Sequence, residues 1–348
     1  MSMIPSVIPI MDFVKREFSY LNRMKYCLGY PRIFAIETTN YCNLHCIMCP
    51  VGTGKITRKK GFIDFNLFRK IIQENKHHIV FTWLHLAGEP LLHPDLVKMV
   101  RFCKENGVYC GMSTNAVLLN PKIARELLDA ELDRITLPVD GNTKETYERV
   151  RRGAKFEQVM ENVIGFLKLK KAGRFVRPVT ELQLIRMKQT EKDIKSFHQT
   201  WTRLGADHVL DKGFDTGAGQ MNEEATELTR LEHRMGHSMH AHTPKRYPCA
   251  YLWHSIVVLW DGTVVPCCRD YNGTLPLGNL KYTSPSKIWN NRKMRELRKK
   301  HILGEWHEIP LCAKCPEWLG YALNVESIIR PLLQLRAVIR VEPVISAV

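Results

Sequence analysis

Between residues 32 and 215, short apolar runs alternate with segments in which apolar residues recur every three to four positions. The runs predict buried strands, and the longer spacing predicts helices that pack on one side. The predicted strands are residues 34–38, 81–87, 108–113, 134–139, 179–187 and 208–211, and the predicted helices are 64–74, 94–106, 121–130, 156–171 and 191–204. Pro or Asp stands near helix starts and Gly near helix ends. This alternation predicts a parallel sheet, open or closed into a barrel, with its chemistry at the carboxyl ends of the strands.

The chain after residue 213 follows a different pattern. Residues 213–219 are rich in glycine, and polar, histidine-rich sequence continues to residue 242. Apolar residues at 256–259 and 263–265 flank Asp261-Gly262, a pair typical of a tight β-hairpin, and a helix is expected near 286–301. The expected organisation is an N-terminal extension at 1–31, a core at 32–215, a linker at 216–244, a second domain at 245–320 and an apolar, basic tail at 321–348.

Composition narrows the class of protein. The 348 residues are 45% hydrophobic and 25% charged, as in an ordinary globular protein. No apolar run is long enough for a transmembrane helix and the first residues do not resemble a secretory signal, so we expect a cytoplasmic location. Eleven cysteines, an odd number, then favour metal or redox chemistry over a disulfide framework.

The chain is strongly basic, with 51 Lys and Arg against 35 Asp and Glu and a net charge of +16. This excess is explained either by solvated helix faces or by an anionic substrate, a nucleic acid or an acidic membrane. Charge alone does not choose among them. In the tail, apolar residues recur at helical spacing among Arg330, Arg336 and Arg340, which predicts a helix that packs on the core or lies on an anionic membrane surface.

Three cysteines form a compact motif directly after the first predicted strand. Cys42, Cys46 and Cys49 have the spacing C-x3-C-x2-C on a loop. Three thiolates so close together can hold three corners of a cubane iron–sulfur cluster and leave the fourth iron open to bind a substrate. The alternative is a zinc site completed by His45 or by Cys312 and Cys315.

The segment from Tyr41 to Pro50, with these three cysteines, resembles the signature of the radical S-adenosylmethionine (SAM) enzymes, although Met48 stands where an aromatic residue is common. The resemblance implies a partial (β/α)6 barrel and a [4Fe–4S] cluster whose open iron binds SAM. It also implies reductive cleavage of SAM to a 5′-deoxyadenosyl radical, with electrons from a flavodoxin or ferredoxin.

Further segments match this family in order along the chain. Ala87-Gly88-Glu89-Pro90 resembles the stretch that contacts the methionine amino group, and Ser113-Thr114-Asn115 ends the next predicted strand. The resemblance implies that the following residues contact SAM: Gly88, Glu89, Ser113, Asn115, Arg151 at the carboxylate, and Gln183 and Met187 near the adenine.

A second group of cysteines lies near the hairpin. Cys249 precedes it, Cys267 and Cys268 follow it, and Cys312 and Cys315 form a distal C-x2-C, which together supply enough ligands for a second cluster. This arrangement resembles the auxiliary-cluster domain called SPASM, or twitch in its short form. We expect one auxiliary [4Fe–4S] cluster on Cys249, Cys267, Cys312 and Cys315, with a structural zinc as the alternative.

The remaining cysteines, Cys27, Cys103 and Cys110, are interpreted as buried thiols.

The resemblance implies a radical SAM oxidoreductase or isomerase, and we expect dehydrogenation or epimerisation of a sugar, cyclitol or other small, anionic metabolite or glycan. Asp270 is then the expected substrate base, Arg269 a hydrogen-bond donor and Cys268 a spare thiol for hydrogen donation. One alternative is a maturase that modifies a ribosomally made peptide or protein. Another is a zinc-stapled, basic module that binds nucleic acid, which the sequence disfavours. Peripheral membrane association stays open.

Overall fold

The computed structural model describes residues 7–31, 33–221, 246–316 and 318. Within them the chain forms one curved sheet with the strand order β6-β5-β4-β3-β2-β1-β7-β8-β9. Seven neighbouring strands, from β6 to β7, run parallel. The pairs β7–β8 and β8–β9 are antiparallel. The predicted β–α alternation and the partial barrel are confirmed.

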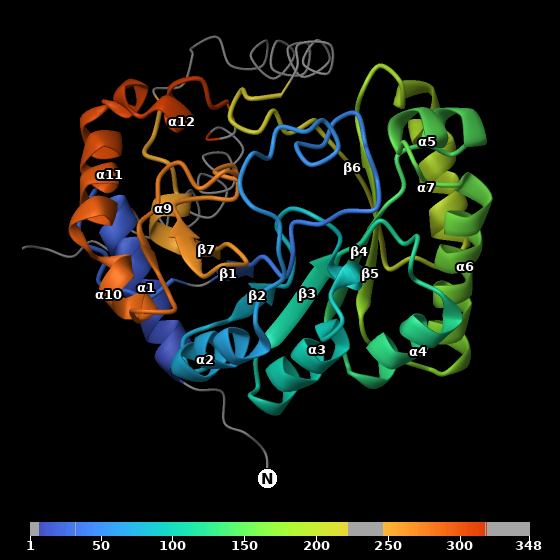
Figure 1. The fold of residues 1–348 in the computed structure, drawn as a ribbon, viewed down its shortest axis with the longest axis horizontal. Coiled ribbons are helices and arrows are strands. Elements are labelled where there is room, and N and C mark those ends of the chain that lie inside the picture. The colour runs from blue at the N-terminus through green and yellow to red at the C-terminus, as the bar shows by residue number, and fades with distance from the viewer. Residues whose placement is uncertain (1–6, 32, 222–245, 317, 319–348) are drawn as a thin grey trace, which may run out of the picture.

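The barrel strands and their helices alternate along the chain. The strands are β1 (Ile33–Ile36), β2 (Phe81–Trp83), β3 (Tyr109–Ser113), β4 (Arg134–Pro138), β5 (Val179–Ile185) and β6 (His208–Lys212). The helices are α2 (Phe65–Asn75), α3 (Leu96–Glu105), α4 (Pro121–Asp129), α5 (Lys144–Val150), α6 (Phe156–Ala172) and α7 (Ile194–Arg203). These helices cover the convex side of the sheet (Figure 1).

Local sequence explains where several helices begin. The Asp64 carboxylate accepts from the backbone N–H groups of Asn66 and Leu67 at the start of α2. Asn120 caps α4 in the same way, with Pro121 in the first turn. The buried core lies mainly between these helices and the sheet, and a smaller cluster with Ala35, Val257 and Val265 lies on the other face.

The C-terminal region joins the barrel sheet. It contains α9 (Tyr251–His254), β7 (Ser255–Val258), β8 (Thr263–Val265), β9 (Gly278–Asn279), α10 (Pro285–Trp289), α11 (Arg292–Leu303) and α12 (Pro310–Ala313). The predicted hairpin is β7–β8, and β7 also pairs in parallel with β1. The hairpin therefore extends the barrel sheet.

Several elements differ from the prediction. The helices α1 (Val7–Leu21) and α5 were not predicted, and β2 ends at Trp83 although its apolar run continues. The helix expected at 286–301 is two helices, because the chain turns at Asn290 and the side chain of Asn291 caps α11. The predicted domain boundaries stay predictions, and most of the predicted linker and the whole tail lie outside the described residues. No helix among the described residues is long and apolar enough to cross a membrane.

Candidate active site

The loop that carries Cys42, Cys46 and Cys49 follows β1 at the carboxyl end of the parallel strands, as predicted. It is anchored to the end of α5, because the N–H groups of His45 and Ile47 donate to the carbonyls of Arg152 and Val150, at 2.8 and 3.1 Å. Gly52 packs against this loop so closely that an added Cβ would lie 2.4 Å from the carbonyl oxygen of Cys46. The backbone of the cysteine loop is therefore held by its neighbours.

The donor set fits an iron–sulfur cluster. Burial raises the pKa of Cys42 to about 11 and also raises the pKa of Cys46, so these thiols need a nearby positive charge to ionise. Among the described residues, no three His, Cys, Asp or Glu side chains lie close enough to hold a single metal ion. In a cubane each cysteine binds a different iron, so its thiols need not converge on one point.

Glu89 is buried beside the cysteine loop. Its Oε1 accepts from Thr114 Oγ1 at 2.7 Å and from the Leu91 N–H at 3.0 Å, while Oε2 accepts from the Asn115 N–H at 2.8 Å. Its own N–H donates to the Tyr41 carbonyl at 2.7 Å. Glu89 therefore links the ends of β2 and β3 to the loop, through its carboxylate and its backbone N–H.

Gly88 and Asn115 complete this link. Gly88 has a φ of +77°, and an added Cβ would lie 2.5 Å from the Tyr41 carbonyl oxygen. The Asn115 amide donates to Asn43 Oδ1 at 2.8 Å and lies 3.9 Å from Cys42 Sγ. The structure thus brings Gly88, Glu89 and Asn115 next to the first cysteine motif; their contact with SAM stays a prediction.

Arg151 lies on the other side of the motif. Its Nε donates to Asp140 Oδ2 at 2.7 Å, and its Nη1 lies 3.9 Å from Cys46 Sγ. Burial disfavours the charged guanidinium, but Asp140 and Cys46 outweigh it and keep the pKa of Arg151 above its usual value. The Asp140 carboxylate also accepts from the Ile185 N–H at 2.7 Å. Arg151 is thus a fixed cation beside Cys46, and its predicted contact with the SAM carboxylate is untested.

Ser113 and Gln183 share one face of the sheet. Ser113 pairs with Thr136, which pairs with Glu181, and Gln183 follows two residues later along β5. Both side chains are half-buried. Met187 is instead buried in the main hydrophobic core, after the end of β5.

The second cysteine group is assembled from three separate segments. The Cys249 N–H donates to His301 Nδ1 at 3.3 Å, and Arg246 Nη2 donates to the Cys312 carbonyl at 3.0 Å. Burial and the nearby Cys249 raise the pKa of Cys312 to about 12. The positive charge of Arg246 acts on Cys249, Cys312 and Cys315 together. This donor set also fits a cluster.

Cys267 and Cys268 both lie near Cys249. Burial raises the pKa of Cys267, and the thiols of Cys268 and Cys249 raise it further. Cys268 Sγ is 3.9 Å from Tyr251 Oη and 3.7 Å from Arg269 Nη1. The choice of Cys267 as the ligand therefore stays a prediction. The three other cysteines, Cys27, Cys103 and Cys110, are buried and free, as expected.

The structure uses the expected substrate residues for other contacts. Asp270 is buried, and its carboxylate accepts from the Thr274 N–H and hydroxyl and from the Leu275 N–H, at 2.7–2.8 Å. Arg269 forms an ion pair with Asp215 at 2.7 Å. A base must reach its substrate, so we do not place proton transfer on Asp270.

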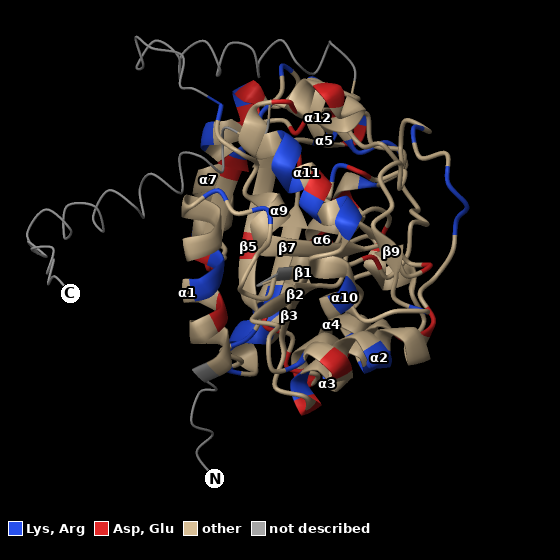
Figure 2. Ribbon diagram, turned by 90° about the vertical axis from the view of Figure 1, so that its left-hand side faces the viewer, with Lys and Arg blue, Asp and Glu red and all other residues tan. Residues whose placement is uncertain are grey.

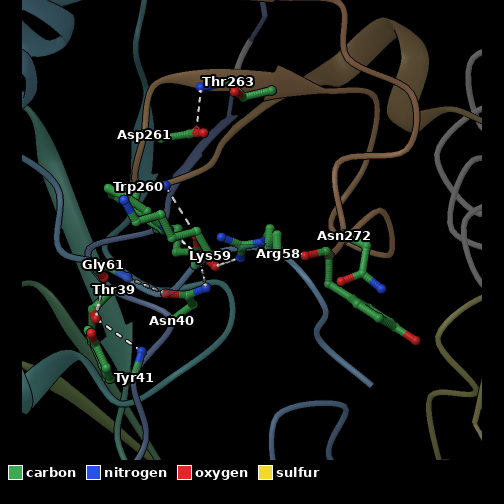
Figure 3. A network of polar contacts seen from close by, with 12 residues as sticks. Thr39, Asn40, Tyr41, Arg58, Lys59, Gly61, Trp260, Asp261, Thr263 and Asn272 are labelled. Atoms are coloured by element: carbon green, nitrogen blue, oxygen red, sulfur yellow. Dashed lines mark hydrogen bonds and ion pairs between the residues drawn. The ribbon is translucent and has the colours of Figure 1, made fainter. Parts of the chain in front are cut away.

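Sequence reasoning missed a polar network between the cysteine loop and the hairpin (Figure 3). The buried Glu37 carboxylate accepts from Arg58 Nη2 and from the Trp260 N–H. Arg58 Nε donates to the Tyr271 carbonyl at 2.5 Å, and Asn272 Nδ2 donates to the Lys55 carbonyl at 2.9 Å. Glu37 lies near the carboxyl end of the predicted strand at 34–38, which was the available signal.

Sequence reasoning also missed His85. Its Nδ1 accepts from the Ser113 N–H at 3.1 Å, so the neutral ring carries its proton on Nε2. Burial, followed by the charge of Lys212, lowers the pKa of His85 to about 4. A neutral donor therefore stands at the carboxyl end of β2.

Comparison with known proteins agrees with this geometry. Residues 36–198 match the family model of the radical SAM superfamily, and residues 249–316 match that of SPASM, an iron–sulfur cluster-binding domain. The chain is 23% identical to the tungsten-containing aldehyde ferredoxin oxidoreductase cofactor-modifying protein of Pyrococcus furiosus, over 80% of this chain and 86% of that one.

Two solved structures share the fold. The complex of BtrN with AdoMet and 2-DOIA has a TM-score of 0.55 and 18% identity, covering 83% of this chain and 94% of that one. Streptococcus suis SuiB bound to precursor peptide SuiA has a TM-score of 0.64 and 13% identity, covering 82% and 70%.

These matches imply a catalytic [4Fe–4S] cluster, SAM and auxiliary iron–sulfur binding, and they favour iron–sulfur over zinc at both cysteine groups. When bound, such a catalytic cluster supplies the electron that cleaves SAM and so generates a 5′-deoxyadenosyl radical. The chain's own residues position the thiols and place the cation of Arg151 beside Cys46. The chain therefore contains a radical SAM domain at residues 36–198 and a C-terminal SPASM iron–sulfur cluster-binding domain at residues 249–316.

Proposed function

We propose that this radical SAM enzyme is a maturase that modifies a peptide or protein by hydrogen abstraction. The alternative is dehydrogenation or epimerisation of a sugar, a cyclitol or another small metabolite. In both cases the first cysteine group and SAM carry the radical step, a second cluster passes electrons, and a flavodoxin or ferredoxin supplies them. The two readings differ in what occupies the substrate site.

The observation that carries the proposal is the free edge of β6. Among the described strands, β6 pairs only with β5, so its outer backbone edge has no strand beside it. Leu210 and Lys212 lie opposite Gln183 and Ile185, which places them on the sheet face that also carries Ser113. An extended peptide can add to such an edge through main-chain hydrogen bonds. This would lead a peptide to the face that carries the predicted SAM contacts.

The contacts of Asp270 and Arg269 weigh against the small-substrate alternative. That reading took Asp270 as the substrate base and Arg269 as a hydrogen-bond donor, and these side chains are held in a buried turn and in an ion pair. Among the related proteins, SuiB was solved with a precursor peptide and the Pyrococcus furiosus relative is described as modifying a cofactor. BtrN was solved with 2-DOIA, and for this reason the small-substrate alternative is retained.

The test uses SAM cleavage as a reporter of substrate. Reconstituted enzyme with SAM and a one-electron reductant is incubated anaerobically with host lysate divided by dialysis into macromolecular and small-molecule fractions. The proposal predicts that the macromolecular fraction stimulates 5′-deoxyadenosine formation and that prior protease treatment abolishes this stimulation. Stimulation by the small-molecule fraction alone, unaffected by protease, would establish the alternative.

A further inference from the structure

The helix α1 has an apolar side that faces outward. Ile10, Val14, Phe18 and Leu21 follow one another at spacings of four, four and three residues, with Met11 beside them. Their exposed fractions are 60%, 56%, 53% and 51%, and 49% for Met11. These five residues are called the apolar face of α1 below. Large apolar side chains at helical spacing normally face a core, so this orientation requires an explanation.

The inward side of the same helix is polar and firmly held. Arg16 Nη1 donates to the Tyr30 carbonyl at 3.1 Å, and Tyr20 Oη donates to the Pro248 carbonyl at 3.0 Å. Ser19 Oγ accepts from the Leu28 N–H at 2.9 Å. Rotating the helix to bury its apolar face would bring these buried groups out of their bonds, which is costly. The outward apolar face is therefore fixed by the fold.

This face is where exposed apolar side chains concentrate. Among the described residues, seven of the eighteen exposed large hydrophobic side chains lie on α1. Scattered exposed apolar residues need no explanation, but a contiguous group on one element marks an interaction site. Figure 2 shows α1 along one side of the molecule.

Charges around the face have one sign. The exposed charged residues between positions 7 and 28 are Lys15, Arg23 and Lys25. The acids Asp12 and Glu17 are half-buried and pair with His78 and His254. The helix has 15 residues, or about 22 Å, which is shorter than the roughly 30 Å hydrocarbon core of a bilayer. An apolar stripe flanked by cations on a short helix is typical of a helix that lies in a membrane interface.

We propose that the apolar face of α1 binds an anionic lipid surface, with the helix parallel to the surface and Lys15, Arg23 and Lys25 at the headgroups. A second copy fits less well, because a twofold interface would bring together two surfaces that carry the same positive charges. The residues beyond 318 also fit less well, because their three arginines outnumber their two glutamates. An anionic lipid surface complements both parts of this surface, because its acyl chains contact the apolar face and its headgroups attract the cations.

The test is flotation of the full chain with vesicles of phosphatidylcholine, with and without about one quarter phosphatidylglycerol. We expect binding to the anionic vesicles that weakens as salt is added. Val14→Ser with Phe18→Ser should lower the partition coefficient about tenfold or more, because two inserted side chains are lost. Ile10→Ser with Leu21→Ser is a second variant of the same face. The control is Val176→Ser, at a residue that is 88% exposed outside α1.

Four results would overturn the proposal. Absence of binding to anionic vesicles at low salt would do so, and so would an equal loss of binding in the Val176→Ser control. A dimer that Val14→Ser with Phe18→Ser converts to a monomer, without vesicle binding, would identify a second copy as the occupant. Vesicle binding that appears only after removal of residues 319–348 would identify that segment as the cover. Vesicle binding does not depend on SAM cleavage, so its failure leaves the proposed function untouched.

Discussion

The two cysteine groups are built in opposite ways. Cys42, Cys46 and Cys49 lie on one loop of eight residues, which Gly52, Arg151 and Glu89 hold from three sides. The second group spans residues 249–315 and comes together only because α9, the β7–β8 hairpin and α12 pack around it. The first site is thus a local sequence motif set on a barrel, and the second depends on tertiary structure throughout.

The largest expected effect comes from removing the first group. Cys42→Ala, Cys46→Ala and Cys49→Ala together should lower the iron content from about eight to about four per chain and abolish SAM cleavage. Iron analysis and chromatography of 5′-deoxyadenosine measure both. If the triple variant still cleaves SAM, the first group is not the catalytic site.

Removing one ligand of the second group should affect substrate turnover and uncoupled SAM cleavage differently. Cys312→Ala should also reduce iron to about four per chain and abolish substrate turnover, while uncoupled SAM cleavage persists. The reason is that Cys312 lies on α12, apart from the barrel loop. Equal loss of cleavage and turnover would show that the second group is needed for the fold of the first.

Gly52→Ala tests how rigidly the cysteine loop is held. The added Cβ would meet the backbone of Cys46 at 2.4 Å, so we expect the free energy of unfolding to fall by about 1–3 kcal/mol, with weaker loading of the first cluster only. The matched control is Gly165→Ala in α6, where an added Cβ meets no atom within 4 Å. That change should raise stability by up to about 1 kcal/mol. An unchanged free energy of unfolding in Gly52→Ala would mean that the cysteine loop can shift at little energetic cost.

A buried histidine near each region should make the stability of the protein depend on pH. Burial lowers the pKa of His85 and of His301 to about 4, whereas the unfolded chain titrates near the usual value of about 6.5. As the pH falls from 6.5 to 4, the unfolded state takes up protons that the folded state does not bind. Stability is therefore full above pH 6.5 and falls below it, by up to about 3 kcal/mol for each histidine.

Urea unfolding of the metal-free protein measures this dependence. His85→Gln and His301→Gln should each flatten the acid limb of the stability curve. If neither substitution changes the fall in stability below pH 6.5, other groups cause the acid sensitivity.

The sequence predicts the barrel well because its signals are local. Alternating periodicity, the cap at Asp64 and the C-x3-C-x2-C spacing each depend on a few neighbouring residues. It misses the pairing of β7 with β1 and the Glu37–Arg58 pair, because both join residues far apart in sequence. It does not show the contacts of Asp270, since a carboxylate beside a cysteine gives no sign that turn N–H groups already bind it. The helix α1 is not predicted from the sequence because its apolar residues face away from the core.

The parallel pairing of β1 with β7 has a consequence for synthesis on the ribosome. β1 ends at Ile36, but its second neighbour begins at Ser255, so more than 200 residues must be made before that edge is covered. During that time the nascent barrel exposes an unpaired apolar strand, which favours association with other chains. A chain that stops before β7 would keep this edge open permanently. The isolated barrel is therefore expected to aggregate, and the complete chain to depend on chaperones until its last strands emerge.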